Sequence, residues 1–110
     1  MLIDTARKLS GELLKSPEYL EYKRAKEELS NDEYVSSLVK AYNALEMSLN
    51  MGSVFEKEPD SLNTKRFEEL SSLIYETREG SAYLLAKMRL QSLVGEVFSI
   101  ISGPIDFFNL

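Results

Sequence analysis

The longest amphipathic pattern in the chain lies near its C-terminal end and predicts one long helix over residues 83–101. At about 3.6 residues per turn, apolar side chains occupy most of the circumference of this segment and leave only a narrow polar arc. The main apolar row consists of Tyr83, Ala86, Leu90, Val94, Val97 and Ile101. Such a helix must be covered on more than one side, by the rest of the chain, by a second copy or by a partner. We therefore interpret it as a core element and not as an active site.

The N-terminal part of the chain predicts two helices separated by a proline. Apolar residues at helical spacing predict an amphipathic helix over residues 2–15. Pro17 disfavours an α conformation at the residue before it, yet it suits the first turn of a new helix. Ser16 is a good cap for that turn, so we expect a second helix over residues 17–29.

Two more helices are expected before the final one, and an internal loop separates them. At Asn31-Asp32, a capping residue followed by an acidic first turn opens a helix that we expect to end near residue 49. Its apolar residues are spaced by three and four, as in the seam of a helical pair. Residues 50–61 contain a Gly and a Pro and predict the loop. The next helix is expected over residues 61 to about 78. Gly80-Ser81 then marks a break before the final helix.

The composition agrees with an all-α fold. Glu, Lys, Leu and Ala are plentiful, Trp is absent, and the chain lacks the evenly spaced turn residues of a sandwich or barrel. A length of 110 residues suits one domain. We predict a single helical domain over residues 1–110, a compact bundle of about five helices with a long, broadly apolar C-terminal helix. Gly103-Pro104 should end that helix and leave residues 103–110 as an apolar tail.

Most catalytic chemistry is excluded by the residues that the chain lacks. It has no His, no Cys and no glycine loop of the dinucleotide-binding or phosphate-binding kind. Carboxylates remain, and a small enzyme that uses them with a divalent cation is an alternative function. The adjacent carboxylates are Glu27, Glu28, Glu68 and Glu69. Neighbouring helical residues point about 100° apart, so neither pair converges on one point. We therefore expect no enzyme, and no catalytic, cofactor-binding or metal-binding residues.

The net charge of −5 is concentrated in the middle of the chain. Residues 30–79 hold five basic and ten acidic side chains, whereas the segments on either side are balanced. Nucleic acids are bound largely through clustered Lys and Arg, so we expect no direct nucleic-acid binding. An acidic middle favours a basic partner, although a solvated helix face is the simpler explanation. The apolar runs are far shorter than the roughly 18 to 20 residues that cross a bilayer, and we expect a cytoplasmic protein without membrane contact.

Two features predict interaction surfaces. On the final helix, Met88 and Phe98 flank Gly95, which lets a neighbouring helix approach closely at a cost of about 1 kcal/mol in helix propensity. The alternative is that Gly95 only fits against the chain's own core. In the tail, Phe107 and Phe108 can dock within the chain, in a homo-oligomer or on a partner, and we favour the homo-oligomer. The expected partners are the chain itself, as a homodimer or higher oligomer, and other proteins. A structural subunit of a larger assembly is a further alternative.

Five stretches of the chain together resemble a known family. They are Tyr19–Leu29, Asn31–Tyr34, Tyr83–Lys87, Leu93–Val97 and Ile100-Ile101. In this order, with a loop in the middle of the chain, they resemble the YlbF/YmcA family of small helical bacterial proteins. The likeness spans nearly the whole chain.

The resemblance implies a helical fold that forms dimers or higher oligomers and a regulatory or adaptor role without enzymatic activity. Members are linked to competence, sporulation and biofilm control, and some act with an endoribonuclease in mRNA processing. An RNA-processing nuclease or a family paralogue is therefore an expected partner. Some members hold an iron–sulfur cluster with cysteines, but this chain has no Cys, so we expect no cluster and no other cofactor. The family has no catalytic residues to transfer to this sequence.

Overall fold

The computed structural model describes the backbone of residues 1–55 and 61–106, and the side chains of these residues except 50–55 and 61. Within them, every regular element is an α-helix. The helices are α1 (Leu2–Leu14), α2 (Pro17–Leu29), α3 (Glu33–Phe55), α4 (Ser61–Tyr75) and α5 (Arg78–Ser102). The prediction of an all-α chain of about five helices with a long final helix is confirmed.

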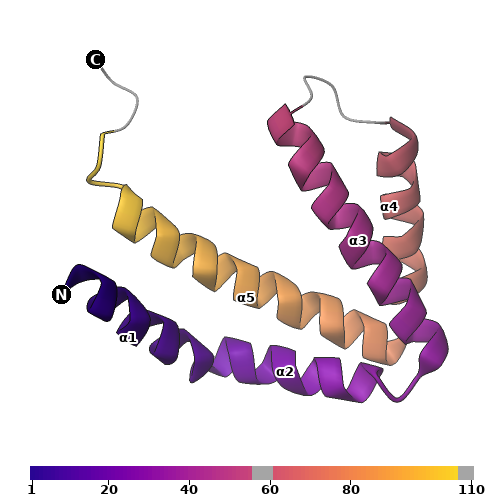
Figure 1. Ribbon diagram of the computed structural model, residues 1–110. Helices are drawn as coiled ribbons and strands as arrows, with labels where there is room; N and C mark the ends of the chain where they lie inside the picture. Colours follow the sequence, from indigo (N-terminus) through magenta and orange to yellow (C-terminus); the bar gives the residue numbers. More distant parts are fainter. Residues whose placement is uncertain (56–60, 107–110) are drawn as a thin grey trace.

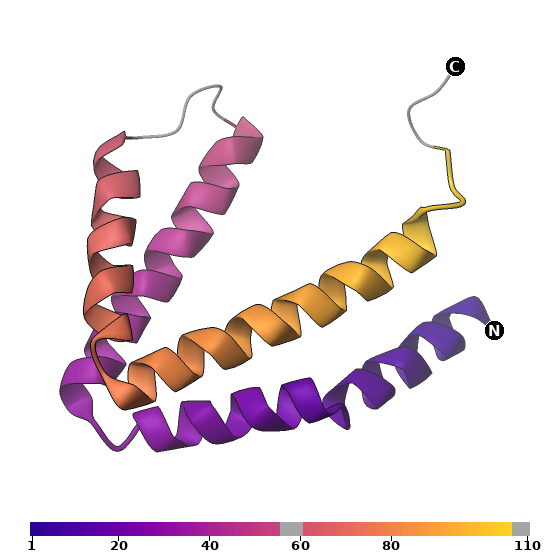
Figure 2. The same cartoon turned by 180° about the vertical axis from the view of Figure 1, so that it is seen from behind.

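The helices form two arms that diverge from a common vertex (Figures 1 and 2). In one arm, α1 and α2 follow one another almost in line, and α5 runs back alongside them. In the other arm, α3 and α4 form an antiparallel hairpin. The molecule is flat, with extents of 46 × 37 × 16 Å, and its radius of gyration of 16.8 Å exceeds the roughly 13 Å of a compact domain of this length. The single chain is therefore an open V and not a closed bundle.

Side chains cap the helix starts that the sequence predicts. At the start of α2, the Ser16 hydroxyl oxygen accepts a hydrogen bond from the Tyr19 N–H at 3.1 Å. At the start of α3, Asp32 Oδ1 accepts a hydrogen bond from the Val35 N–H at 3.2 Å. These caps satisfy N–H groups that have no partner inside the helix. The predicted helix start at Pro17 is confirmed. The helix predicted from the Asn31-Asp32 signal also forms, but its cap is Asp32 and its first residue is Glu33.

The end of α3 differs from the prediction, because the helix continues to Phe55. Residues 50–55 contain no proline, and the single Gly52 costs only about 1 kcal/mol in helix propensity. The loop predicted over residues 50–61 therefore overlaps the last turns of α3 and the first residue of α4.

The start of α5 also differs, because the chain breaks at Glu76-Thr77 and not at Gly80-Ser81. Thr77 is the N-cap of α5, and its hydroxyl oxygen accepts a hydrogen bond from the Gly80 N–H at 3.0 Å. Gly80 thus lies in the first turn of the helix. A Cβ atom there would collide with the Ile74 carbonyl oxygen and with the Thr77 hydroxyl. The glycine is needed for space at the tight connection between α4 and α5.

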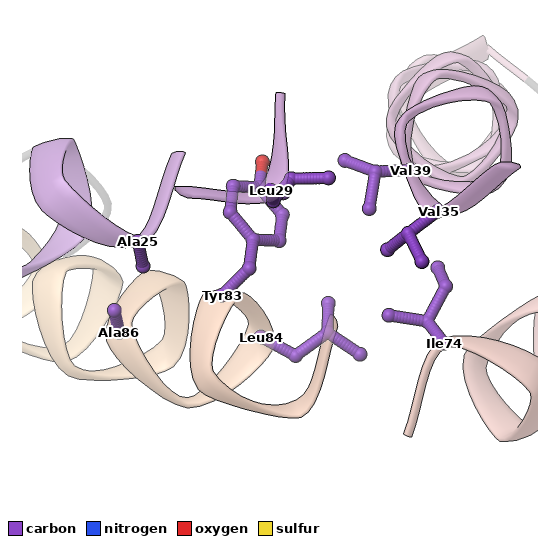
Figure 3. Close-up of a cluster of buried hydrophobic side chains, with 8 residues drawn as sticks. All are labelled: Ala25, Leu29, Val35, Val39, Ile74, Tyr83, Leu84 and Ala86. Carbon is purple, nitrogen blue, oxygen red and sulfur yellow. The ribbon is translucent and has the colours of Figure 1, made fainter. Parts of the chain in front are cut away.

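The buried core lies at the vertex (Figure 3). Among the described residues, its buried hydrophobic members are Ala25, Leu29, Val35, Val39, Ile74, Tyr83, Leu84 and Ala86. Ile74 of α4 is 0% exposed and Tyr83 of α5 is 1% exposed. The final helix was predicted to be a core element along its whole length, but its buried residues lie only between Gly80 and Ala86. No residue of α1 is buried, and neither is any residue of α5 beyond Ala86. Beyond the vertex, apolar side chains such as Leu90, Leu93 and Val97 are only half-buried.

We predict that Gly80→Ala lowers the free energy of unfolding by about 2 kcal/mol or more, because the new methyl group must displace the backbone at Ile74. Gly95→Ala is the matched control. No atom lies within 4 Å of its Cβ position, so the same change raises the free energy of unfolding by up to about 1 kcal/mol through helix propensity. Urea denaturation of both variants at one protein concentration measures the difference. Equal effects of the two changes would contradict the role given to Gly80.

Candidate interaction surfaces

Polar side chains connect the two arms beside the buried core. We call Tyr22, Asn43, Glu46, Tyr83 and Lys87 the vertex network. The Tyr83 hydroxyl lies 3.4 Å from the Tyr22 hydroxyl and accepts a hydrogen bond from Asn43 Nδ2 at 3.1 Å. The Lys87 ammonium donates to Asn43 Oδ1 and to Glu46 Oε1, each at 2.7 Å. The vertex network therefore ties α2 and α5 to α3.

The surroundings of the vertex network favour a structural role. Burial, and next the hydrogen bond with Tyr83, raise the pKa of the Tyr22 phenol, which keeps it neutral. Beside the network, the Tyr42 and Phe67 rings stack with their centroids 4.5 Å apart. Lys87 Nζ lies 5.1 Å from the centroid of the Tyr42 ring. The Lys87 ammonium thus contacts both polar side chains and an aromatic ring of α3. These contacts set the position of α5 against the α3–α4 hairpin.

The carboxylates considered as a cation site do not gather into one. Glu27, Glu28, Glu68 and Glu69 are all exposed. Over residues 1–55 and 61–106, no three or more His, Cys, Asp or Glu side chains are grouped in a way that could hold a metal ion. The same residues contain no helix that is long and apolar enough to cross a membrane. What the described structure offers is surfaces for contact with other molecules.

Large apolar side chains are exposed on α1 and on the second half of α5. We call them together the arm-end surface. Its members are Leu2, Ile3, Leu14, Val94, Phe98, Ile100 and Ile101, all of them exposed. Leu2 is 80% exposed and Phe98 is 67% exposed. Exposed apolar side chains of this number make the arm-end surface a candidate contact site.

The predicted interface residues lie at different places on α5. Phe98 belongs to the arm-end surface. Gly95 faces open space, so none of the chain's own core packs on it. Met88 is exposed closer to the vertex, where its sulfur accepts a hydrogen bond from the Tyr75 hydroxyl at 3.6 Å. The Phe107-Phe108 pair lies outside the described residues. An interface role for these residues stays a prediction.

A groove lies between α3 and α4 in the other arm, and we call it the hairpin groove. It has a volume of about 490 Å³ and is lined by Ala41, Ala44, Leu45, Ser48, Arg66, Glu69, Leu70 and Leu73. The small side chains of α3 leave room beside the leucines of α4. Arg66 and Glu69 stand one helical turn apart with opposite charges. Grooves of this composition accept the apolar side of an amphipathic helix.

The fold defines a class: an all-helical chain of two arms, each of which carries a candidate contact surface. The particular family follows from the sequence. The model of the family described as control of competence regulator ComK, YlbF/YmcA, matches residues 2–106. The chain belongs to this family, which confirms the resemblance found in its sequence.

The relatives agree with this assignment. A UPF0342 protein of Caldicellulosiruptor bescii is 25% identical over 94% of this chain and 87% of its own length. A UPF0342 protein of Symbiobacterium thermophilum is 24% identical over 96% of this chain and 94% of its own length.

Two solved structures share the fold. A Bacillus stearothermophilus protein of unknown function (DUF964) aligns with a TM-score of 0.74 at 16% identity, covering 94% of this chain and 91% of its own. The second structure is of Bacillus subtilis RicA in complex with RicF. It aligns with a TM-score of 0.59 at 20% identity, covering 92% of this chain and 90% of its own.

We predict that Lys87→Met destabilises the fold more than Arg89→Met does. Lys87 and Glu46 are only 13% and 25% exposed, so removing the ammonium leaves the Glu46 carboxylate and Asn43 Oδ1 short of a partner, at a cost of about 1 to 3 kcal/mol. The pair of Arg89 with Glu21 is 59% and 48% exposed and contributes at most about 1 kcal/mol. Chemical denaturation of the two variants provides the comparison. A larger loss in the Arg89 variant would contradict a structural role of the vertex network.

Proposed function

We propose that this chain is a non-enzymatic regulatory adaptor that assembles with itself and, in that form, binds other proteins. The observation that carries the proposal is the arm-end surface. A chain of this length has few apolar side chains to spare, and here several of the largest remain in water, including Phe98 and Ile101. Burial of each such side chain by a partner would contribute roughly 1.5 to 3 kcal/mol to the free energy of association.

Family membership supports the same function. The family is that of YlbF/YmcA competence regulators, and the RicA neighbour was solved in complex with another protein, RicF. We propose that this chain likewise works through a protein complex in the cytoplasm. Its pathway is then one of competence, sporulation or mRNA processing, and its partners include a family paralogue or an RNA-processing nuclease.

An adaptor needs more than one surface, and the two arms provide two. The arm-end surface serves self-association in this proposal. The hairpin groove on the other arm serves a second protein, through an amphipathic helix that places apolar side chains beside Ala44 and opposite charges against Arg66 and Glu69. Because the arms diverge from the vertex (Figure 2), the surfaces can be occupied at the same time.

One chain has a mass of 12.5 kDa, so self-association predicts a solution mass of two or more times this value. Size-exclusion chromatography with light scattering at micromolar concentration measures this mass. A monomer under these conditions would overturn the self-associating form of the proposal.

Binding of a second protein predicts a specific loss in a groove variant. Ala44→Trp fills the hairpin groove with a large side chain, whereas Ala82→Trp makes the same change at an exposed position outside it. Each of the three forms of the chain serves as bait in affinity capture from the source organism. Mass spectrometry then measures the family paralogues and ribonucleases that each form retains. We expect wild type and Ala82→Trp to capture a partner and Ala44→Trp to lose at least tenfold of it. Equal capture by both variants would exclude the groove as the binding site.

A further inference from the structure

We infer that the two arms are levers joined by a pivot at the vertex, and that the ion pair of Lys87 with Glu46 is a latch that sets the angle between them. The latch joins α5 of one arm to α3 of the other. Its release lets the α3–α4 hairpin rotate against the α2–α5 arm while each arm keeps its own packing. The device belongs to the single chain and does not depend on what binds to either arm.

The backbone passes between the two arms at the vertex, through two short connections. The α2–α3 connection consists of residues 30–32, and the α4–α5 connection consists of Glu76 and Thr77. Figures 1 and 2 show both connections at the end of the molecule where the arms meet. A few residues at the ends of helices are enough to absorb the dihedral changes of a hinge. The two connections therefore define an axis about which the hairpin can rotate.

The buried core lies close to this axis. Its members from the hairpin are Val35 and Val39, in the first two turns of α3, and Ile74, in the last turn of α4. A side chain near an axis moves little when the far end of its helix moves. The core therefore holds the arms together but resists a change of angle less than a contact farther out.

The latch lies farther out along both arms. At a rise of about 1.5 Å per residue, Glu46 lies roughly 20 Å along α3 from its first residue, about two turns beyond Val39. The Lys87 ammonium also donates to Asn43 Oδ1 at 2.7 Å and lies 5.1 Å from the centroid of the Tyr42 ring. One ammonium on α5 thus holds three side chains of α3 at a distance from the axis where it has leverage over the angle.

Both partners of the latch keep access to water. The Lys87 and Glu46 side chains are 13% and 25% exposed, so water can replace their contact as the arms separate, and neither charge is then left buried. The ammonium ends a flexible four-carbon chain that can follow such a movement. A second contact between the arms, from the Tyr75 hydroxyl to the Met88 sulfur, is weak because a thioether is a weak acceptor. The latch is therefore a charged contact that the chain can exchange for water.

The angle matters because the two candidate surfaces lie on different arms. The arm-end surface belongs to α1 and α5, and the hairpin groove belongs to α3 and α4. A rotation of about 12° would move the far end of α3, roughly 34 Å from its start, by about 7 Å. The latch thus sets the distance between the two surfaces.

Distances between spin labels test the latch. The chain has no Cys, so introduced cysteines can be labelled in pairs. Lys65→Cys on α4 with Ser99→Cys on α5 measures a distance across the arms, and Lys23→Cys on α2 with Ser99→Cys measures a distance within one arm. All three positions are exposed. Double electron–electron resonance in a large excess of unlabelled chain restricts the measurement to pairs within one chain.

The latch is removed by Lys87→Met in each labelled form. Arg89→Met is the matched control, because it removes an ion pair with Glu21 of α2, inside one arm. We expect Lys87→Met to shift or widen the distance distribution across the arms by about 3 Å, since a rotation of about 12° moves Lys65, roughly 15 Å from the axis, by that amount. The distance within one arm stays constant, and Arg89→Met changes neither distance.

Circular dichroism of every variant reports whether helix content is kept. Should Lys87→Met unfold, Glu46→Gln takes its place, because it removes the charge of the latch and keeps a side chain of the same size. An unchanged distance across the arms in the folded latch variant would overturn the inference, and so would an equal change in Arg89→Met. Neither result alters the expected oligomer mass or the capture of a partner by the hairpin groove, so the proposed function is tested separately.

Discussion

The packing of Tyr83, Ile74 and Val35 at the vertex is the contact on which the rest of the structure depends. These side chains are the largest of those that are almost fully buried, and they come from α5, α4 and α3. Because Ala25 and Leu29 of α2 belong to the same cluster, one small core joins both arms. Apolar burial and dispersion contacts stabilise this point, and the vertex network fixes the angle at which the arms leave it.

The position of the core explains why the arms are open. A core at one end of two long arms fully covers only the helix segments that meet there, so α1 and the second half of α5 have no fully buried residue among those described. A compact fold of the same chain would have to bend α5, whose pattern from Arg78 to Ser102 is uninterrupted by proline. The long straight helix therefore positions the vertex and presents the arm-end surface at the same time.

Much of the fold could be predicted from the sequence, because local chemistry determines it. Ser16 and Pro17 mark the start of α2 through capping and a fixed backbone angle, and the Asn31-Asp32 pair marks the start of α3. Apolar spacing places Tyr83 in the main apolar row of the final helix. The boundary at Thr77 was harder to predict. In the sequence, Gly80 resembles a helix-breaking residue, and only the structure shows that it is a glycine because the Ile74 backbone lies too close for a side chain.

The interaction surfaces were predicted only in part. Periodicity shows which side of a helix is apolar but not what covers it, so Phe98 was a candidate while α1 was predicted only as an amphipathic helix. The hairpin groove depends on how α3 and α4 are set against each other, which residue spacing within one helix does not give. The function proposed for this family member therefore depends on shape and exposed area, which no single residue type indicates.

A chain that completes its core with a second copy must gain stability from its own concentration. Thermal unfolding followed by circular dichroism, over a hundredfold range of protein concentration, measures this most directly. A two-state dimer of this size predicts a midpoint that rises by about 6 °C across the range. A midpoint that stays constant from the lowest to the highest concentration would show that the single chain is the folding unit, and would contradict an interface that completes the fold.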